Sequence, residues 1–129
     1  MKLAELTTHT QALAERLEDP AFRERWERTA LARTVALRVV TYRAQHELSQ
    51  AQLAKHLGLK PAVVARLELG EQNPSLEMLY LLSQRLGIEF VIDIAPAGSD
   101  RLLQRSLEHA EVVEAFTSET GSHVLIAIT

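Results

Sequence analysis

Three glycines divide the middle of the sequence into short segments whose apolar residues have helical spacing. Glycine tolerates the left-handed conformation in which helices commonly end, so Gly58, Gly70 and Gly87 indicate three helix ends. The expected helices span residues 49–57, 60–68 and 75–86. The first two are too short to be stable in isolation, so they need a shared hydrophobic core. We expect that core to contain these side chains: Leu53, Ala54, Leu57, Val64 and Leu67.

Polar residues and a proline mark where these helices begin. Ser49 and Gln52 have the spacing of a capping box, in which each side chain bonds the other residue's backbone N–H. Pro61 opens the second helix, where its missing N–H costs nothing, and Ser75 caps the third. The leucines of that third helix are expected to face the core: Leu76, Leu79, Leu82 and Leu86. Two short helices joined by a tight turn are typical of a helix-turn-helix unit, although a plain helical hairpin has the same spacing.

The N-terminal third of the chain is also predicted to be helical. Leucines at helical spacing indicate a helix over residues 3–18, and an Asp-Pro pair then caps the next helix. That helix has no internal proline or glycine, so it is predicted to run from Pro20 to about His46. Phe22 and Trp26 are four residues apart and form its expected apolar anchor.

The spacing of apolar residues changes after the last of these helices. Residues 88–95 alternate as a β-strand does, residues 101–116 have helical spacing, and residues 123–129 form a second short apolar strand. Each strand needs a neighbour for its backbone N–H and C=O groups. Two arrangements remain open: parallel pairing within one chain, or pairing across a two-fold axis. We hypothesise a homodimer built on strand 88–95, with the C-terminal arm completing the sheet.

Composition argues against several classes of protein. Of the 129 residues, 47% are hydrophobic but only 5% aromatic, which suits helices packed on helices. The absence of cysteine excludes disulfides and cysteine-ligated zinc, and the five histidines lack metal-site spacing, so no metal or cofactor is expected. The sequence contains no glycine-rich phosphate-binding loop and no nucleophile elbow, so we do not expect an enzyme. No signal peptide or membrane span is evident, so we expect a cytoplasmic protein.

The net charge of −3 is unevenly placed along the chain. Residues 97–129 contain 2 of the 14 basic and 5 of the 17 acidic residues, so the preceding residues are neutral overall. Net charge therefore gives no support for nucleic-acid binding. Basic side chains gathered on one face would still suffice for it.

Several separated stretches together resemble the Xre/Cro-type helix-turn-helix family. They are residues 48–54 (LSQAQLA), Gly58, residues 64–70 (VARLELG) and residues 73–76 (NPSL). The resemblance covers about residues 32–87. The flanking residues 18–22 (EDPAF), followed by a long helix, and a terminal strand ending in Ala95-Pro96 are similar to HigA-like antitoxins. Members of that family pair with a small ribonuclease toxin and repress their own operon.

The resemblance and the helical pattern together imply a mainly α fold. We expect a five-helix Xre-type helix-turn-helix domain with an N-terminal helical extension and a C-terminal strand-helix-strand arm. The expected parts are the extension (1–30), the DNA-binding domain with its terminal strand (31–96), and an acidic helix-strand arm (97–129).

The resemblance also implies which residues contact DNA: Gln50, Lys60, Pro61, Ala62, Arg66, Gln72 and Asn73. Gln50 matches the position that holds a DNA phosphate at the start of the first short helix. Arg66 is the best base reader of the second, because a guanidinium bonds guanine O6 and N7 together. Gln72 and Asn73 lie in the loop after this helix, where phosphate contacts are expected. Arg43 and Glu68 match a family pair with a structural role.

The second short helix departs from the family pattern. Family members commonly carry polar Ser, Gln and Thr where this chain has Lys60, Pro61, Ala62 and Val63, and Ser in place of Ala65. Two alternatives follow from this shortage of polar groups. In the first, which we favour, Ala62 and Val63 contact thymine methyl groups, Arg66 supplies the polar readout and Lys60 contacts a phosphate. In the second, the fold serves as a platform for a protein partner.

The sequence therefore predicts a sequence-specific transcriptional regulator, an autorepressing antitoxin-like protein that binds a palindromic operator as a homodimer. The alternative is a protein-interaction module that neutralises a toxin and binds DNA weakly or not at all. In that case a small basic ribonuclease would bind either to residues 1–30, which include Phe22 and Trp26, or to the acidic arm. A neighbouring reading frame for a basic, RelE-like protein would favour a toxin partner.

Overall fold

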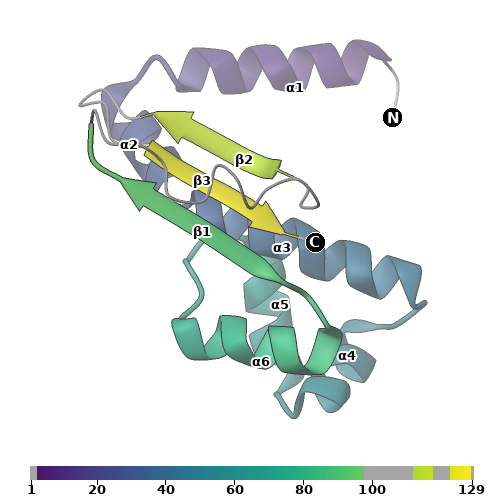
Figure 1. The fold of residues 1–129 in the computed structure, drawn as a ribbon. Coiled ribbons are helices and arrows are strands. Elements are labelled where there is room, and N and C mark those ends of the chain that lie inside the picture. The colour runs from purple at the N-terminus through teal and green to yellow at the C-terminus, as the bar shows by residue number, and fades with distance from the viewer. Residues whose placement is uncertain (1–2, 98–111, 118–122, 129) are drawn as a thin grey trace.

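The computed structural model describes residues 3–97, 112–117 and 123–128 (Figure 1). Its helices are α1 (Leu3–Arg16), α2 (Pro20–Arg28), α3 (Ala30–Gln45), α4 (Gln50–Leu57), α5 (Pro61–Leu69) and α6 (Leu76–Leu86). Its strands are β1 (Phe90–Ala95), β2 (Val112–Thr117) and β3 (His123–Ile128). The prediction of a mainly α fold is confirmed.

The three strands form one antiparallel sheet in the order β1-β3-β2. The terminal strands of the sequence prediction thus pair within one chain, with Phe90 opposite Ile128 and Ala95 opposite His123. Two expectations are corrected. Pairing within the chain is antiparallel and not parallel, and residues 112–116 belong to strand β2, not to a helix over 101–116. The rest of that predicted helix lies outside the described residues. Strand β2 covers the second edge of β3, which leaves the backbone groups of β3 paired on both sides.

The long helix expected over residues 20–46 is interrupted at Thr29, so this prediction is wrong. Thr29 has φ −101° and ψ 16°, and it separates α2 from α3. The side chain of Asn73, from the loop before α6, bonds both sides of the junction. Its Nδ2 donates to the carbonyl of Arg28 at 2.7 Å, and its Oδ1 accepts from the N–H of Ala32 at 3.1 Å. The separation of α2 from α3 is therefore stabilised by a residue more than 40 positions further along the chain.

The helices predicted from glycines and caps are present, and their apolar faces form the core. Gly58, Gly70 and Gly87 all have positive φ and end α4, α5 and α6. The buried core of these helices and α3 contains Val35, Val39, Leu53, Ala54, Leu57, Val64, Leu79, Leu82 and Leu86. The sheet contributes Ile126, and Leu67 packs against the cluster as a partly buried side chain. Leu76 departs from the prediction, because 80% of its surface is exposed.

Helices α4, α5 and α6 lie together at one end of the molecule, and α1 lies at the other, with the sheet between them (Figure 1). Helix α3 connects these parts, since it packs against α5 as well as against β2 and β3. Among the described residues, no helix combines the length and apolar character that crossing a membrane requires.

Candidate nucleic-acid interface

Helices α4 and α5 form a compact unit whose ends are fixed by local chemistry. The Ser49 side chain accepts from the backbone N–H of Gln52 at 3.1 Å, and the Gln52 side chain accepts from the N–H of Ser49 at 2.8 Å. This is the predicted capping box. Gly58 then ends α4 in the left-handed conformation, and Pro61 opens α5 at its first turn. The reversal between the two helices therefore needs only three residues.

The orientation of α5 is fixed by an ion pair to α3. The Glu68 side chain is 6% exposed and accepts from Nε of Arg43 at 2.7 Å and 3.1 Å, one contact to each carboxylate oxygen. Arg43 also donates to the carbonyl of Leu48, in the turn before α4, at 3.0 Å. The expected structural role of this pair is confirmed. One arginine joins the end of α3, the turn and the last part of α5.

The opposite face of α5 points into solvent. Lys60, Pro61, Ala62 and Arg66 are all exposed, as is Leu69 in the last turn. Ala62, Arg66 and Leu69 are spaced four and three residues apart, so they share one face of the helix. This face carries one guanidinium and little other hydrogen-bonding capacity. It offers apolar contacts and a single bidentate donor, which suit a thymine methyl and a guanine edge.

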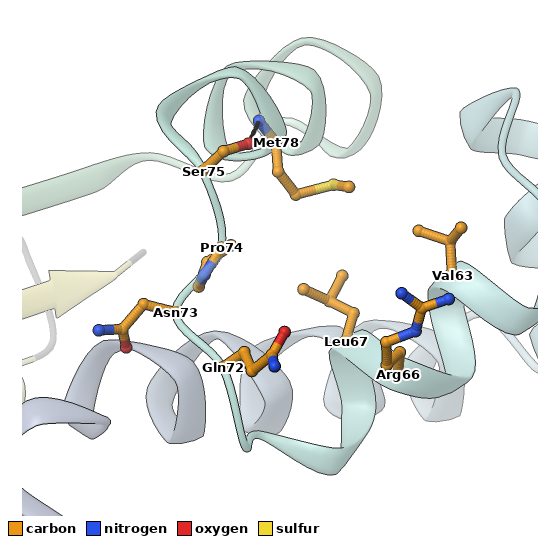
Figure 2. Close-up of a pocket in the computed structure, with 8 residues that line it drawn as sticks. All are labelled: Val63, Arg66, Leu67, Gln72, Asn73, Pro74, Ser75 and Met78. Atoms are coloured by element: carbon orange, nitrogen blue, oxygen red, sulfur yellow. Dashed lines mark hydrogen bonds between the residues drawn. The ribbon is translucent and has the colours of Figure 1, made fainter. Parts of the chain in front are cut away.

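A hollow of about 170 Å³ lies beside this face, between α5 and the start of α6 (Figure 2). Val63, Arg66 and Leu67 of α5 form one wall, and Gln72 projects into the space between α5 and the loop, as Figure 2 shows. Met78 of α6 closes the opposite side. Neither Leu67 nor Met78 is among the residues predicted from the sequence to contact DNA. Their apolar character at helical spacing indicates core packing, and only their partial exposure places them at the surface.

The three amide residues of the predicted site have different surroundings. The Gln50 side chain is exposed, but its Nε2 donates to Glu68 at 3.1 Å, so it takes part in the ion-pair cluster that holds α5. The amide of Asn73 is used at both ends in the junction between α2 and α3. The Nδ2 of Asn73 has a second hydrogen, so the phosphate contact expected at Asn73 stays a prediction. Gln72 is exposed beside the hollow.

Comparison with known proteins identifies the same segment. A family model described as helix-turn-helix matches residues 41–92. An uncharacterized HTH-type transcriptional regulator of Methanocaldococcus jannaschii is 35% identical over 48 residues, which cover 37% of this chain and 73% of the relative. A second, from Archaeoglobus fulgidus, is 34% identical over 47 residues, which cover 36% of this chain and 66% of the relative. No solved structure matches. The matched segment contains every residue of the exposed face of α5.

Proposed function

This chain belongs to the Xre-type helix-turn-helix family of DNA-binding transcriptional regulators, and we propose that it reads a specific operator through the exposed face of α5. The observation that carries this proposal is the fixed orientation of α5. Glu68 is held by Arg43 on the inner side, so Arg66, two positions earlier, projects from the other side. A reading helix must present its side chains in one orientation, and this ion pair provides it.

The proposed readout uses few polar contacts. Arg66 bonds O6 and N7 of a guanine, while Ala62 and Val63 contact the methyl groups of neighbouring thymines. The exposure of Ala62 and the partial exposure of Val63, at the rim of the hollow, support this assignment. Specificity would then come from one guanine and adjacent A·T pairs.

Contacts to phosphates would set the position of the chain on the duplex. Lys60 stands exposed at the start of α5 and supplies one such contact. The amide nitrogen of Gln50 has two hydrogens, and the bond to Glu68 uses only one of them, so the other remains for a phosphate. Gln72 extends the contact surface along the loop. Asn73 contributes by holding the loop through its bonds to the α2–α3 junction.

Replacing Arg66 tests this readout. Arg66→Ala should weaken binding to the cognate site by about 1–3 kcal/mol and relax the preference at one base position. Binding-site selection followed by titration of the enriched sequence measures both effects. Arg85→Ala is a matched control, because it removes an exposed arginine from the last turn of α6. If the Arg66 variant keeps wild-type affinity and preference, the assignment is wrong. A shallow salt dependence with no enriched sequence would favour the partner-platform alternative.

We further propose that the protein acts in the cytoplasm as an antitoxin-like repressor of its own operon and binds a palindrome as a homodimer. The similarity of residues 18–96 to HigA-like antitoxins supports this role. So does the position of α1 at the other end of the molecule from α5, since a toxin bound there would leave the DNA-binding face free (Figure 1). In this proposal the division into residues 1–30, 31–96 and 97–129 corresponds to toxin binding, DNA binding and the acidic arm.

The aromatic pair on α2 bears on the choice of toxin-binding surface. Phe22 and Trp26 stack with ring centroids 6.1 Å apart, and arginines of this chain cover them. The guanidinium carbon of Arg16 lies 4.3 Å from the Phe22 ring centre, and that of Arg33 lies 3.5 Å from the Trp26 ring centre. The positive charge of these two arginines is unfavourable for a small basic ribonuclease, so the acidic arm is the other surface on which such a toxin would bind. Co-expression with the product of a neighbouring small basic reading frame tests the antitoxin role, and failure to form a complex would contradict it.

A further inference from the structure

The C-terminal end of α2 lies against the loop that follows α5. The Nδ2 of Asn73 donates to the carbonyl of Arg28, the last residue of α2, at 2.7 Å. Asn73 also lines the hollow beside the exposed face of α5 (Figure 2). One side chain therefore connects the end of α2 to the proposed DNA-binding surface, although the two are far apart in the sequence.

The last turn of α2 carries two exposed arginines, Arg25 and Arg28. In the part of the chain that the structure describes, neither guanidinium makes an ion pair or a hydrogen bond. Arg23, on the same helix, differs, because it bonds Glu27 at 3.1 Å. Successive residues of a helix turn by about 100°, so Arg25 and Arg28 are about 60° apart around α2, and Arg23 is nearly opposite to Arg25.

The ending of α2 does not require these two positive charges. Cations in the last turn of a helix often bond its final carbonyls or offset its dipole. Here neutral side chains already bond the carbonyls of both residues. The Thr29 hydroxyl donates to that of Arg25 at 2.9 Å, and the Asn73 amide donates to that of Arg28. Both guanidinium groups are therefore available to a ligand.

The loop next to this end of α2 has no positive charge of its own. Residues 71–75 (EQNPS) contain one acidic residue, Glu71, and no lysine or arginine. Helix α5 has nine residues and spans about 13 Å, close to the width of the DNA major groove, about 12 Å. Contacts before and after α5 would therefore fall on the phosphate backbones that border the groove. Lys60 serves the first of these, but the loop offers the second only neutral groups and Glu71.

We propose that Arg25 and Arg28 bind phosphates of the DNA duplex, beside the loop after α5 and outside the bases that α5 reads. The proposal rests on the DNA binding proposed for α5 and extends the contact surface to the N-terminal helices. A guanidinium presents paired N–H donors that match a phosphate group. Contacts of this kind add affinity and fix the position of the protein without reading sequence.

A double variant that combines Arg25→Gln and Arg28→Gln tests this site, and one that combines Arg23→Gln and Arg85→Gln is its matched control. All four arginines are exposed, so both variants remove two positive charges from the surface. Each phosphate contact contributes about 0.9 to the slope of log affinity against log salt concentration. The test variant should therefore lose about 1.8 of this slope for each bound copy of the chain, and about tenfold in affinity at about 0.15 M salt. The control should keep the wild-type slope.

Titration of the sequence enriched by binding-site selection, at several salt concentrations, gives these slopes. The base preference of the test variant should remain that of the wild type, because phosphate contacts do not read bases. Phosphate ethylation interference locates the contacts, and interference at the outermost phosphates of the site should disappear in the test variant. A second variant with Arg25→Lys and Arg28→Lys keeps both charges and should retain most of the slope.

Circular dichroism and thermal unfolding establish that each variant folds, and replacements at exposed positions should leave the transition in place. The proposal is overturned if the folded test variant keeps the wild-type slope, or if the control loses as much slope as the test variant does. It is also overturned if the lost interference falls within the bases read by α5 and not at the edge of the site.

Failure of this proposal is distinguishable from failure of the proposed DNA readout. If Arg66→Ala relaxes base preference while the test variant keeps its slope, α5 reads the operator and α2 does not contact it. If selection enriches no sequence, a duplex of random sequence is titrated instead. A lower slope for the test variant on that duplex would support the phosphate contacts of α2, although the readout by α5 would then be wrong.

Discussion

The two faces of α5 differ in how much the rest of the molecule constrains them. On the inner face, Val64 is fully buried and Glu68 is bonded to Arg43 and Gln50. On the outer face, Ala62, Arg66 and Leu69 are exposed, and within the described residues the Arg66 side chain makes no hydrogen bond. The nine residues of α5 are therefore constrained in two different ways. The inner face is set by the fold, and the outer face is free to be set by a ligand.

This difference separates variants that affect folding from variants that affect binding. A change on the inner face should lower stability, and it should reduce DNA binding through unfolding or through loss of the orientation of α5. A change on the outer face should reduce binding and leave the unfolding transition in place, because exposed substitutions usually change stability by less than about 0.5 kcal/mol.

The largest effect on stability is expected for Glu68→Gln. The substitution keeps the shape of the side chain but removes the negative charge that faces Arg43, which is 22% exposed. Removing one partner of a fully buried ion pair costs about 3–5 kcal/mol, and the partial exposure of Arg43 reduces the expected loss here to about 2–3 kcal/mol. Chemical denaturation measures it. Glu77→Gln, an exposed carboxylate in the first turn of α6, is the control, and an equal loss there would contradict the assignment.

A smaller loss is expected at the end of α5, where Gly70 approaches α3. Gly70 has φ +66°, and an added Cβ would lie 3.3 Å from the Cβ of Ala36 and 3.3 Å from the Cα of Arg33. Gly58, at φ +70°, has open space at the same position. Gly58→Ala should therefore cost about 1 kcal/mol through its backbone alone, and Gly70→Ala about 2 kcal/mol. Thermal unfolding of the two variants compares them, and equal losses would mean that α3 yields to the added methyl group.

The smallest effect is expected for Lys60→Ala on the outer face. Removal of one phosphate contact should weaken binding by no more than about 1 kcal/mol for every sequence and lower the salt dependence by about one counterion. Titrations at several salt concentrations measure the slope. Lys55→Ala, an exposed lysine in the last turn of α4, should leave the slope unchanged. If Lys60→Ala instead alters base preference, the lysine reads a base edge and the outer face is more specific than proposed.

Much of the helical framework is predictable because its signals are local. The Ser49–Gln52 capping box, the left-handed glycines and the Ser75 cap each involve residues within a few positions of one another. The Arg43–Glu68 pair spans 25 positions, and its prediction came from resemblance to a family. The burial of Leu53, Leu57 and Val64 follows from helical spacing.

The predictions from the sequence are wrong where contacts between segments far apart in the chain override the local pattern. The break at Thr29 depends on the amide of Asn73, and no local signal reports that bond. Residues 112–116 have helical spacing, yet they form part of strand β2, because β3 offers a ladder of backbone partners. Leu76 fits the apolar stripe of α6, but it is placed in the first turn, where the core does not reach it.

The sequence by itself determined where four helices end or begin and most of the side chains that α4, α5 and α6 bury, because caps, glycines and helical periodicity act over a few residues. Only the tertiary structure decided how the strands pair, that α2 and α3 are separate, and that the amide of Asn73 bonds the junction between them. It also decided that Leu76 and Tyr80 lie exposed beside β1. Each of these depends on which distant backbone and side-chain groups meet, and contacts of that kind leave no periodic signal in the chain.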